Sequence, residues 1–229
     1  MAPYLATVTS FANVPQTDAG VDTLQFLEAS KGLVGIFDLL ASTVLTVVSN
    51  DLNGNIAKVR ARYDEAPEKS ATLEELVKNE IAENKSQATQ GLLWLTRGLA
   101  FTCKALKATQ QDPTLELSTA FQNAYGDTLR PYHSFLVKPI FSAAMKACPK
   151  RDDLYTKLAE DKTGDTVTTE EYRNQLLDDW LAALDLILVK IDAFYEENKY
   201  KKVSHFSQGN ICEERTISRR IGTFPEVWT

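Results

Sequence analysis

The stretch Ser49-Asn-Asp-Leu-Asn-Gly-Asn-Ile-Ala-Lys-Val-Arg-Ala-Arg-Tyr63 decides the fold of this chain. Apolar residues recur there at the spacing of an α-helix, at Val44, Val48, Leu52, Ile56, Val59 and Tyr63. On that helix Asp51, Asn55 and Lys58 fall at i, i+4 and i+7 and project from one face. The spacing therefore gathers an acceptor-only carboxylate, an amide and a donor-only ammonium, which together suit a neutral, hydroxyl-rich ligand such as a sugar.

A plainer interpretation of the same stretch stays open at this point. Asn53-Gly54 is a turn signal, and a turn there would end the helix and leave three unrelated polar residues in a loop. Polar residues on a helix are also usually its solvated face. The functional interpretation therefore needs support from elsewhere in the chain.

Length and composition limit the function classes. The chain has 229 residues, of which 44% are hydrophobic, so it is long enough to bury a substantial core and is expected to form one main domain. A net charge of -6 argues against a nucleic-acid partner, because such binders usually carry a basic face. The three cysteines are an odd number and lack the patterned spacing of a disulfide framework, which is typical of reduced thiols in a cytosol.

We expect neither a signal peptide at the N-terminus nor a membrane-spanning helix. Residues 1–11 lack a basic stretch followed by an apolar run, so we expect no signal peptide. The longest apolar run, Gly32 to Val48, is interrupted by Asp38 and favours a buried helix over a membrane span. We expect residues 1–17 to form a loose N-terminal arm and residues 204–229 to form a poorly ordered tail, with one domain over 18–203.

Helical periodicity and stop signals predict an all-α chain of about eight helices. Two capping boxes, Thr72 with Glu75 and Thr168 with Glu171, each predict a helix start. The first expected helix begins at Asp18 or Asp22 and ends near residue 40. The other seven are expected over about 42–64, 72–85, 86–109, 115–125, 127–147, 152–161 and 168–200.

The signatures of common enzymes and metal sites are missing. His133 and His205 are the only histidines and sit in no metal-binding spacing, and the chain has no phosphate loop, dinucleotide fingerprint or nucleophile elbow. Cys103 and Cys148 lie in apolar contexts typical of core packing, although sequence leaves a Cys-His pair open. We expect no enzymatic activity, no metal and no cofactor.

A second region of interest runs from Arg130 to Phe141. It places His133 near apolar residues, where a histidine is ordinarily part of the core but can also hydrogen-bond an amide at the mouth of a cavity. Aromatic and basic residues surround it and suit either contact with a bilayer interface or a solvated helix end: Tyr132, Phe135, Lys138 and Pro139.

Three ordered motifs carry a resemblance to a known family. Asp51-Leu-Asn-Gly-Asn55-Ile-Ala-Lys58, then Leu93-Trp-Leu-Thr-Arg-Gly-Leu99, then Tyr132-His133 followed by Ile140-Phe141-Ser-Ala-Ala, resemble the glycolipid transfer protein family. The resemblance covers about residues 24–203. It implies a two-layer helical sandwich that binds one glycosphingolipid, such as galactosylceramide or lactosylceramide, and transfers or senses it without covalent chemistry.

The resemblance also implies roles for single residues. Asp51, Asn55 and Lys58 would bond the first sugar, and Trp94 would stack on its ring. His133 would bond the ceramide amide, whose other side Asp51 would hold. Tyr200 matches a family tyrosine that supports the sugar site, and Phe135 stands where members often carry a membrane-inserting tryptophan. The lipid chains would lie among a group of apolar residues, each of which could equally be an ordinary core residue: Phe37, Val44, Leu45, Phe101, Phe121, Leu129, Phe141 and Ile187.

The resemblance leaves two alternatives. A related branch carries phosphorylated ceramide, but Asn55 and Trp94 here stand where that branch has lysine and arginine. A dianionic phosphate would need that added positive charge, so a neutral head group is favoured. The protein could instead be an adaptor that responds to lipid. We expect a cytoplasmic monomer that contacts membranes transiently.

Overall fold

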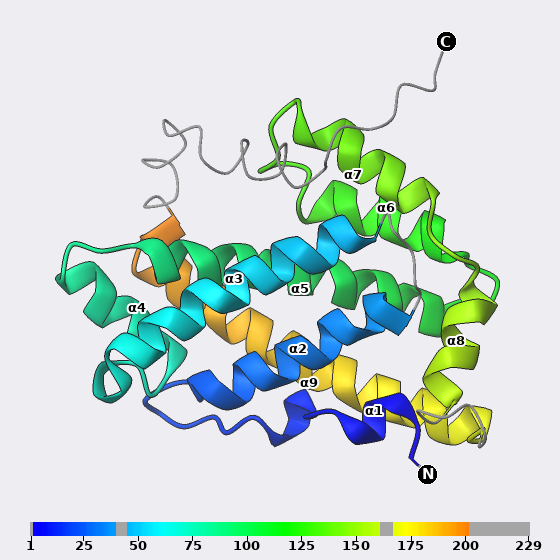
Figure 1. Ribbon diagram of the computed structural model, residues 1–229, viewed down its shortest axis with the longest axis horizontal. Helices are drawn as coiled ribbons and strands as arrows, with labels where there is room; N and C mark the ends of the chain where they lie inside the picture. Colours follow the sequence, from blue (N-terminus) through cyan, green and yellow to red (C-terminus); the bar gives the residue numbers. More distant parts are fainter. Residues whose placement is uncertain (1, 40–44, 161–166, 202–229) are drawn as a thin grey trace.

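The computed structural model describes residues 2–39, 45–160 and 167–201, and these ranges are helical, with β-structure limited to isolated bridges (Figure 1). Val44 and the tail 204–229 lie outside the described residues. The helices are α1 Tyr4–Thr7, α2 Thr23–Leu39, α3 Thr46–Glu65, α4 Leu73–Ala82, α5 Gln87–Gln111, α6 Leu117–Asp127, α7 Val137–Lys146, α8 Arg151–Ala159 and α9 Glu170–Glu197, with short 3-10 helices at Phe11–Asn13 and Pro67–Lys69.

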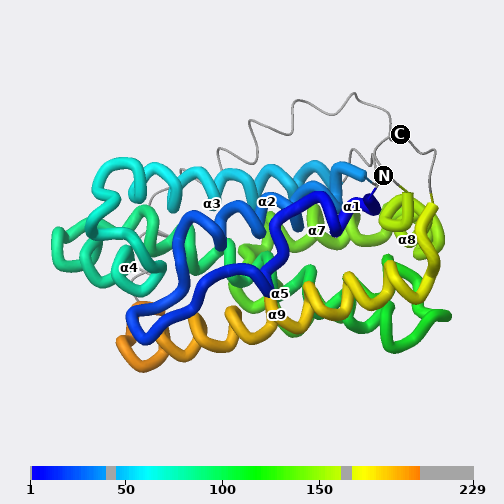
Figure 2. The backbone as a smooth tube through the Cα atoms, turned by 90° about the horizontal axis from the view of Figure 1, so that it is seen from below, coloured from blue at the N-terminus to red at the C-terminus, as the bar shows by residue number. Residues whose placement is uncertain are grey.

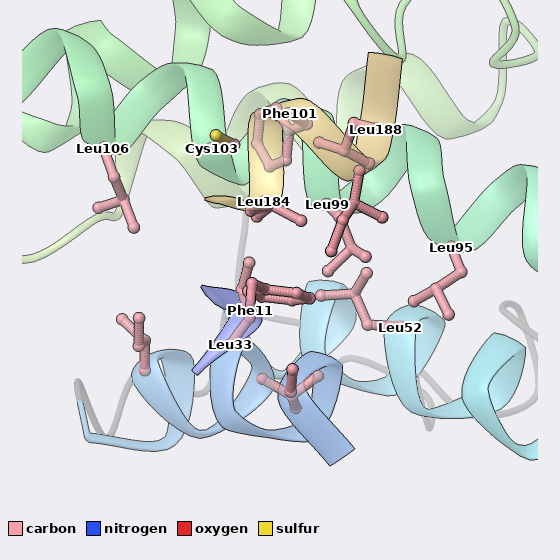
Figure 3. Close-up of a cluster of buried hydrophobic side chains, with 14 of the residues drawn as sticks. Phe11, Leu33, Leu52, Leu95, Leu99, Phe101, Cys103, Leu106, Leu184 and Leu188 are labelled. Carbon is pink, nitrogen blue, oxygen red and sulfur yellow. The ribbon is translucent and has the colours of Figure 1, made fainter. Parts of the chain in front are cut away.

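The long helices form two layers, as the resemblance to the family implied. Helices α2 and α3 lie together in one layer, and α5 and α9 lie in the other (Figure 2). The core fills the space between them. Leu33 of α2 and Leu52 of α3 face Leu99 of α5 and Leu184 of α9 across it (Figure 3).

Helices α3 and α5 approach closely because two glycines of α5 face α3. A Cβ atom on Gly91 would lie 2.9 Å from Cβ of Lys58, and one on Gly98 would lie 2.7 Å from Cδ2 of Leu52. The two contacts show that the helices run antiparallel. They also place the polar face of α3 beside the part of α5 that carries Trp94.

The turn signal at Asn53-Gly54 does not end a helix. Helix α3 continues through both residues to Glu65, and a Cβ atom on Gly54 would meet nothing within 4 Å. Asp51, Asn55 and Lys58 therefore share one continuous helix, and the loop interpretation of this stretch is wrong.

The first residues of the chain do not form a loose arm. Phe11 is only 1% exposed and packs against Phe26 and Trp180, with ring centroids 6.0 and 4.8 Å apart. The hydroxyl of Tyr4 donates to the carbonyl of Gly32 at 2.8 Å. The segment is held because its apolar side chains complete the core between α2 and α9 (Figure 3).

Two other expectations about helices need correction. The helix expected over 127–147 is shorter than predicted, because residues 128–136 form turns and only α7, Val137–Lys146, is helical. Pro131 lacks the N–H that a continuous helix would need, whereas Pro139 lies in the first turn of α7, where that N–H is not required. At α9 the cap is Thr169, whose side chain accepts from the N–H of Tyr172, and not Thr168. The capping box of Thr72 and Glu75 is confirmed.

Among the helices in the described ranges, none combines the length and apolar character needed to cross a bilayer.

Candidate functional site

The three polar residues of α3 form a linked chain. The amide nitrogen of Asn55 donates to Oδ2 of Asp51 at 3.4 Å, and Nζ of Lys58 donates to Oδ1 of Asn55 at 3.1 Å. Asn55 is 3% exposed, whereas Asp51 and Lys58 are half-buried. The ammonium thus fixes the orientation of the amide, and the set presents a donor, an acceptor and a mixed group side by side. We call these three residues the polar trio.

Trp94 projects from the face of α5 that packs on α3. It lies one turn from Gly91 and one from Gly98, the two glycines that contact Lys58 and Leu52. Its half-buried indole stacks on His133, with centroids 5.8 Å apart and an interplanar angle of 22°. The indole therefore lies between the helix that carries the polar trio and the turn that carries His133.

His133 lies in the turn between α6 and α7 and not on a helix face. Its Nδ1 is 3.0 Å from the hydroxyl of Tyr125, and its ring centroid is 4.4 Å from that of Phe141. Burial, aided by the positive charges of Lys138 and Arg97, lowers the pKa of His133 to about 4. The imidazole is therefore neutral near pH 7, with one nitrogen that donates and one that accepts.

Two members of this cluster were not among the predicted site residues. The guanidinium of Arg97 lies 3.5 Å from the ring centroid of Tyr132 and 5.1 Å from that of Trp94, and its burial lowers its pKa. Arg97 could have been found from the sequence, because it follows Trp94 by three residues and therefore shares a face of the helix with it. Tyr125 gives no such signal, because only the fold of the 128–136 turn brings His133 back to it.

Tyr200 packs at the end of α9. Its ring centroid is 5.7 Å from that of Phe194 and 6.5 Å from that of Tyr195, whose hydroxyl donates to the carbonyl of Thr89 on α5 at 2.7 Å. Tyr200 thus packs against the end of α9, and Tyr195 ties that end to the start of α5. Its support of a sugar stays a prediction.

The described residues that were expected to line a slot for lipid chains are buried, and three of them are in ring contact. Phe121 lies between Phe37 and Phe101, at centroid distances of 6.0 and 5.2 Å. Phe141 stacks on Tyr125 at 5.6 Å. The remaining described candidates are also buried: Leu45, Leu129 and Ile187. These side chains belong to one buried core cluster, so an acyl chain that enters between the layers would have to displace them.

A polar pocket of about 510 Å³ adjoins the polar trio on the Lys58 side. Arg62 and Lys85 contribute positive charge to its wall, and each pairs with a glutamate: Nη1 of Arg62 lies 2.8 Å from Glu83, and Nζ of Lys85 lies 2.5 Å from Glu65. The pocket gives the ammonium of Lys58 an open, hydrophilic side.

Several side chains on either side of His133 reach solvent. Phe135 is 78% exposed, Leu136 is 52% exposed, and Tyr132 and Pro139 are exposed beside them, while Lys138 is half-buried. Leu136 extends the predicted set of membrane-contact candidates. An apolar tip therefore projects beside the cluster of Trp94 and His133.

Within residues 2–39, 45–160 and 167–201, no group of three or more histidine, cysteine or acidic side chains could hold a metal ion. Cys103 is buried in the core, and burial raises the pKa of its thiol to about 12. Its thiol donates to the carbonyl of Leu181 at 3.5 Å.

Comparisons with known proteins agree with this geometry. The family model described as "Glycolipid transfer protein (GLTP)" matches residues 21–160. A glycolipid transfer protein of Aureobasidium melanogenum is 44% identical over 192 residues, which cover 84% of this chain and 92% of that protein. The chain covers only 37% of a human relative, pleckstrin homology domain-containing family A member 8, at 34% identity.

Two solved structures are similar over nearly their whole length. The crystal structure of HET-C2, a fungal glycolipid transfer protein, has a TM-score of 0.77 and 43% identity and covers 84% of this chain and 96% of its own. A structure that describes how FAPP2 selects simple glycosphingolipids using the GLTP fold has a TM-score of 0.75 and 33% identity, with coverage of 85% and 95%.

Proposed function

Because the chain belongs to the glycolipid transfer protein family, we propose that it binds one neutral glycosphingolipid and transfers it between membranes. The observation that carries this proposal is the linked trio of Asp51, Asn55 and Lys58 on the helix that faces Trp94. A carboxylate, an amide and an ammonium offer a sugar both acceptors and donors. The indole offers a flat apolar surface.

The sugar would sit on Trp94 with its hydroxyls toward the polar trio. The C–H face of a sugar ring is apolar and packs well on an aromatic face, whereas its hydroxyls need hydrogen-bond partners when they leave water. Stacking then orients the ring, and the hydrogen bonds of the trio select it. This division explains why polar and aromatic groups are needed on adjacent helices.

The ceramide amide would be held between Asp51 and His133. A carboxylate only accepts hydrogen bonds and suits the amide N–H, while a neutral imidazole can donate to the amide carbonyl. The low pKa of His133 keeps that imidazole neutral. Recognition of the amide distinguishes a sphingolipid from an ester-linked lipid.

The lipid chains explain why a carrier is needed. A buried methylene contributes about 0.8 kcal/mol, so moving a sixteen-carbon chain into water costs roughly 13 kcal/mol and makes unaided exchange slow. The two helix layers would part to admit the chains among the buried aromatic residues. We propose that the exposed tip around Phe135 contacts the bilayer, and that a cytoplasmic monomer does this transiently and without covalent chemistry.

A neutral head group is favoured over a phosphate. The carboxylate of Asp51 would repel a dianion, and Lys58 is the one cation of the trio. Arg97 lies nearby, but its guanidinium covers the ring of Tyr132.

Transfer of fluorescent galactosylceramide between vesicles tests the proposal. Trp94→Ala and Asp51→Val should abolish transfer and keep the helical circular dichroism. Tyr172→Ala and Asp152→Val, which alter exposed residues away from the site, should transfer normally. Full transfer by Trp94→Ala or Asp51→Val contradicts the proposal. Unlabelled lactosylceramide should compete with the probe, and stronger competition by ceramide 1-phosphate would favour the phosphorylated lipid instead.

A further inference from the structure

The hydrogen bond between Tyr125 and His133 has a consequence for how the site presents the imidazole. The Tyr125 hydroxyl and Nδ1 of His133 are 3.0 Å apart, and either atom could be the donor. A neutral imidazole carries its proton on Nδ1 or on Nε2, and the partner of Nδ1 decides which. The direction of this one bond therefore fixes what Nε2 offers to a ligand.

The surroundings of Tyr125 favour its hydroxyl as the donor. Tyr125 is only 3% exposed, and among the described ranges of the chain the structure gives this hydroxyl no partner besides Nδ1 of His133. If Nδ1 carried the proton, the phenolic proton would be buried without an acceptor, which is unfavourable. Donation by Tyr125 satisfies that proton and leaves the imidazole proton on Nε2.

Packing holds both rings in this arrangement. Tyr125 stacks on Phe141 with an interplanar angle of 10°, and its ring also meets Phe101 edge-on at 6.4 Å. His133 is held between Trp94 and Phe141. Three helices thus fix the pair before any ligand arrives, and preorganised groups lose less entropy on binding.

We propose that Tyr125 is a positioning residue that keeps His133 in the Nε2-protonated tautomer, so that His133 donates to a carbonyl oxygen of the lipid. The inference rests on the proposed function for the identity of that carbonyl, the ceramide amide. The carboxylate of Asp51 only accepts hydrogen bonds and would bond the amide N–H, so the site would bind the amide group in one direction. Tyr125 sets this direction without touching the lipid.

The first test is direct and needs no lipid. Nitrogen-15 NMR of the imidazole in the ligand-free protein at pH 7 distinguishes the two tautomers, and a His205→Gln variant assigns the signals. We expect the Nε2-protonated form for His133 and a mixture of tautomers in Tyr125→Phe, which loses only the hydroxyl. A predominantly Nδ1-protonated imidazole, or an unchanged tautomer in Tyr125→Phe, overturns the proposal.

The second test is a double-mutant cycle measured by galactosylceramide binding. Tyr125→Phe should weaken binding about tenfold in the wild-type background and cause no further loss in a His133→Ala background. Equal losses in both backgrounds would mean that Tyr125 acts only on stability. Tyr155→Phe, which removes another buried hydroxyl, one that lies 3.1 Å from the hydroxyl of Thr109, should leave binding unchanged.

The two tests separate failure of this inference from failure of the proposed function. If the wild-type protein binds no galactosylceramide, the proposed function fails, while the tautomer of the ligand-free protein still decides the role of Tyr125. If it binds the lipid and His133 is protonated on Nδ1, the function stands and this inference falls.

Discussion

Residue identity explains the chemistry of the head-group site. The polar trio follows from helical spacing, which is why Asp51, Asn55 and Lys58 could be grouped from sequence. Tyr125 and the stacking of His133 on Trp94 could not, because those contacts join three different elements. Periodicity describes one helix at a time, and a partner across a turn is set by tertiary packing.

The ionisation of His133 makes stability depend on pH. Its pKa is about 4 in the folded protein against an ordinary value of 6.5, so the unfolded chain takes up the proton first as the pH falls. This contribution to the free energy of unfolding should decrease by about 2 to 3 kcal/mol between pH 6.5 and pH 4 and level off below about pH 3.

Urea denaturation at several pH values measures this effect. A His133→Gln variant serves as the control, since the difference between its pH profile and that of the wild type isolates the histidine from the carboxyl groups. Parallel profiles for the two proteins over this range would show that burial does not disfavour the charged imidazole.

At the scale of elements, the site depends on the close approach of α3 and α5. Gly91→Ala places a methyl group 2.9 Å from Cβ of Lys58 and 3.4 Å from the carbonyl oxygen of Asn55, so the helices must move apart at the polar trio. We expect a loss of about 1 to 3 kcal/mol of stability and weaker galactosylceramide binding. Thermal unfolding and a binding titration measure the two effects.

Gly54→Ala is the matched control on the facing helix. A Cβ atom there meets nothing within 4 Å, so relief of the helix-breaking glycine should stabilise the protein by up to about 1 kcal/mol. Binding should stay unchanged. A Gly91→Ala protein as stable and as tightly binding as the wild type would show that the close approach is not required.

The elements themselves were largely predictable, and the errors have physical causes. Strong apolar periodicity and capping signals located α2, α3, α4, α5 and α9. The 128–136 turn was missed because its apolar residues continue a helical spacing, although Pro131 interrupts the hydrogen bonds. Burial of Phe11 was missed because a short segment between prolines carries no period.

For the whole molecule, the exposed apolar tip predicts how the protein meets a membrane. Phe135→Ala removes a largely exposed side chain, so stability should change by less than about 0.5 kcal/mol. Vesicle binding and the initial transfer rate should fall about tenfold, since an inserted phenyl group contributes roughly 1.5 to 3 kcal/mol. Sedimentation with phosphatidylcholine vesicles measures the first quantity.

The same variant separates membrane contact from lipid recognition. Affinity for galactosylceramide added without vesicles should be unchanged in Phe135→Ala, because the tip lies outside the polar trio. Tyr172→Ala, an exposed aromatic substitution on α9, should behave as the wild type in both assays. Normal vesicle binding by Phe135→Ala would place the membrane contact elsewhere.

The central claim is that a polar trio, an indole and a neutral imidazole select a neutral sugar on a ceramide. Native mass spectrometry of the protein incubated with an equimolar mixture of galactosylceramide, ceramide 1-phosphate and galactosyl diacylglycerol tests it most directly. We predict one retained molecule per protein monomer with the mass of galactosylceramide, chemically unchanged. Retention of ceramide 1-phosphate or of the ester-linked galactolipid in its place would contradict the account.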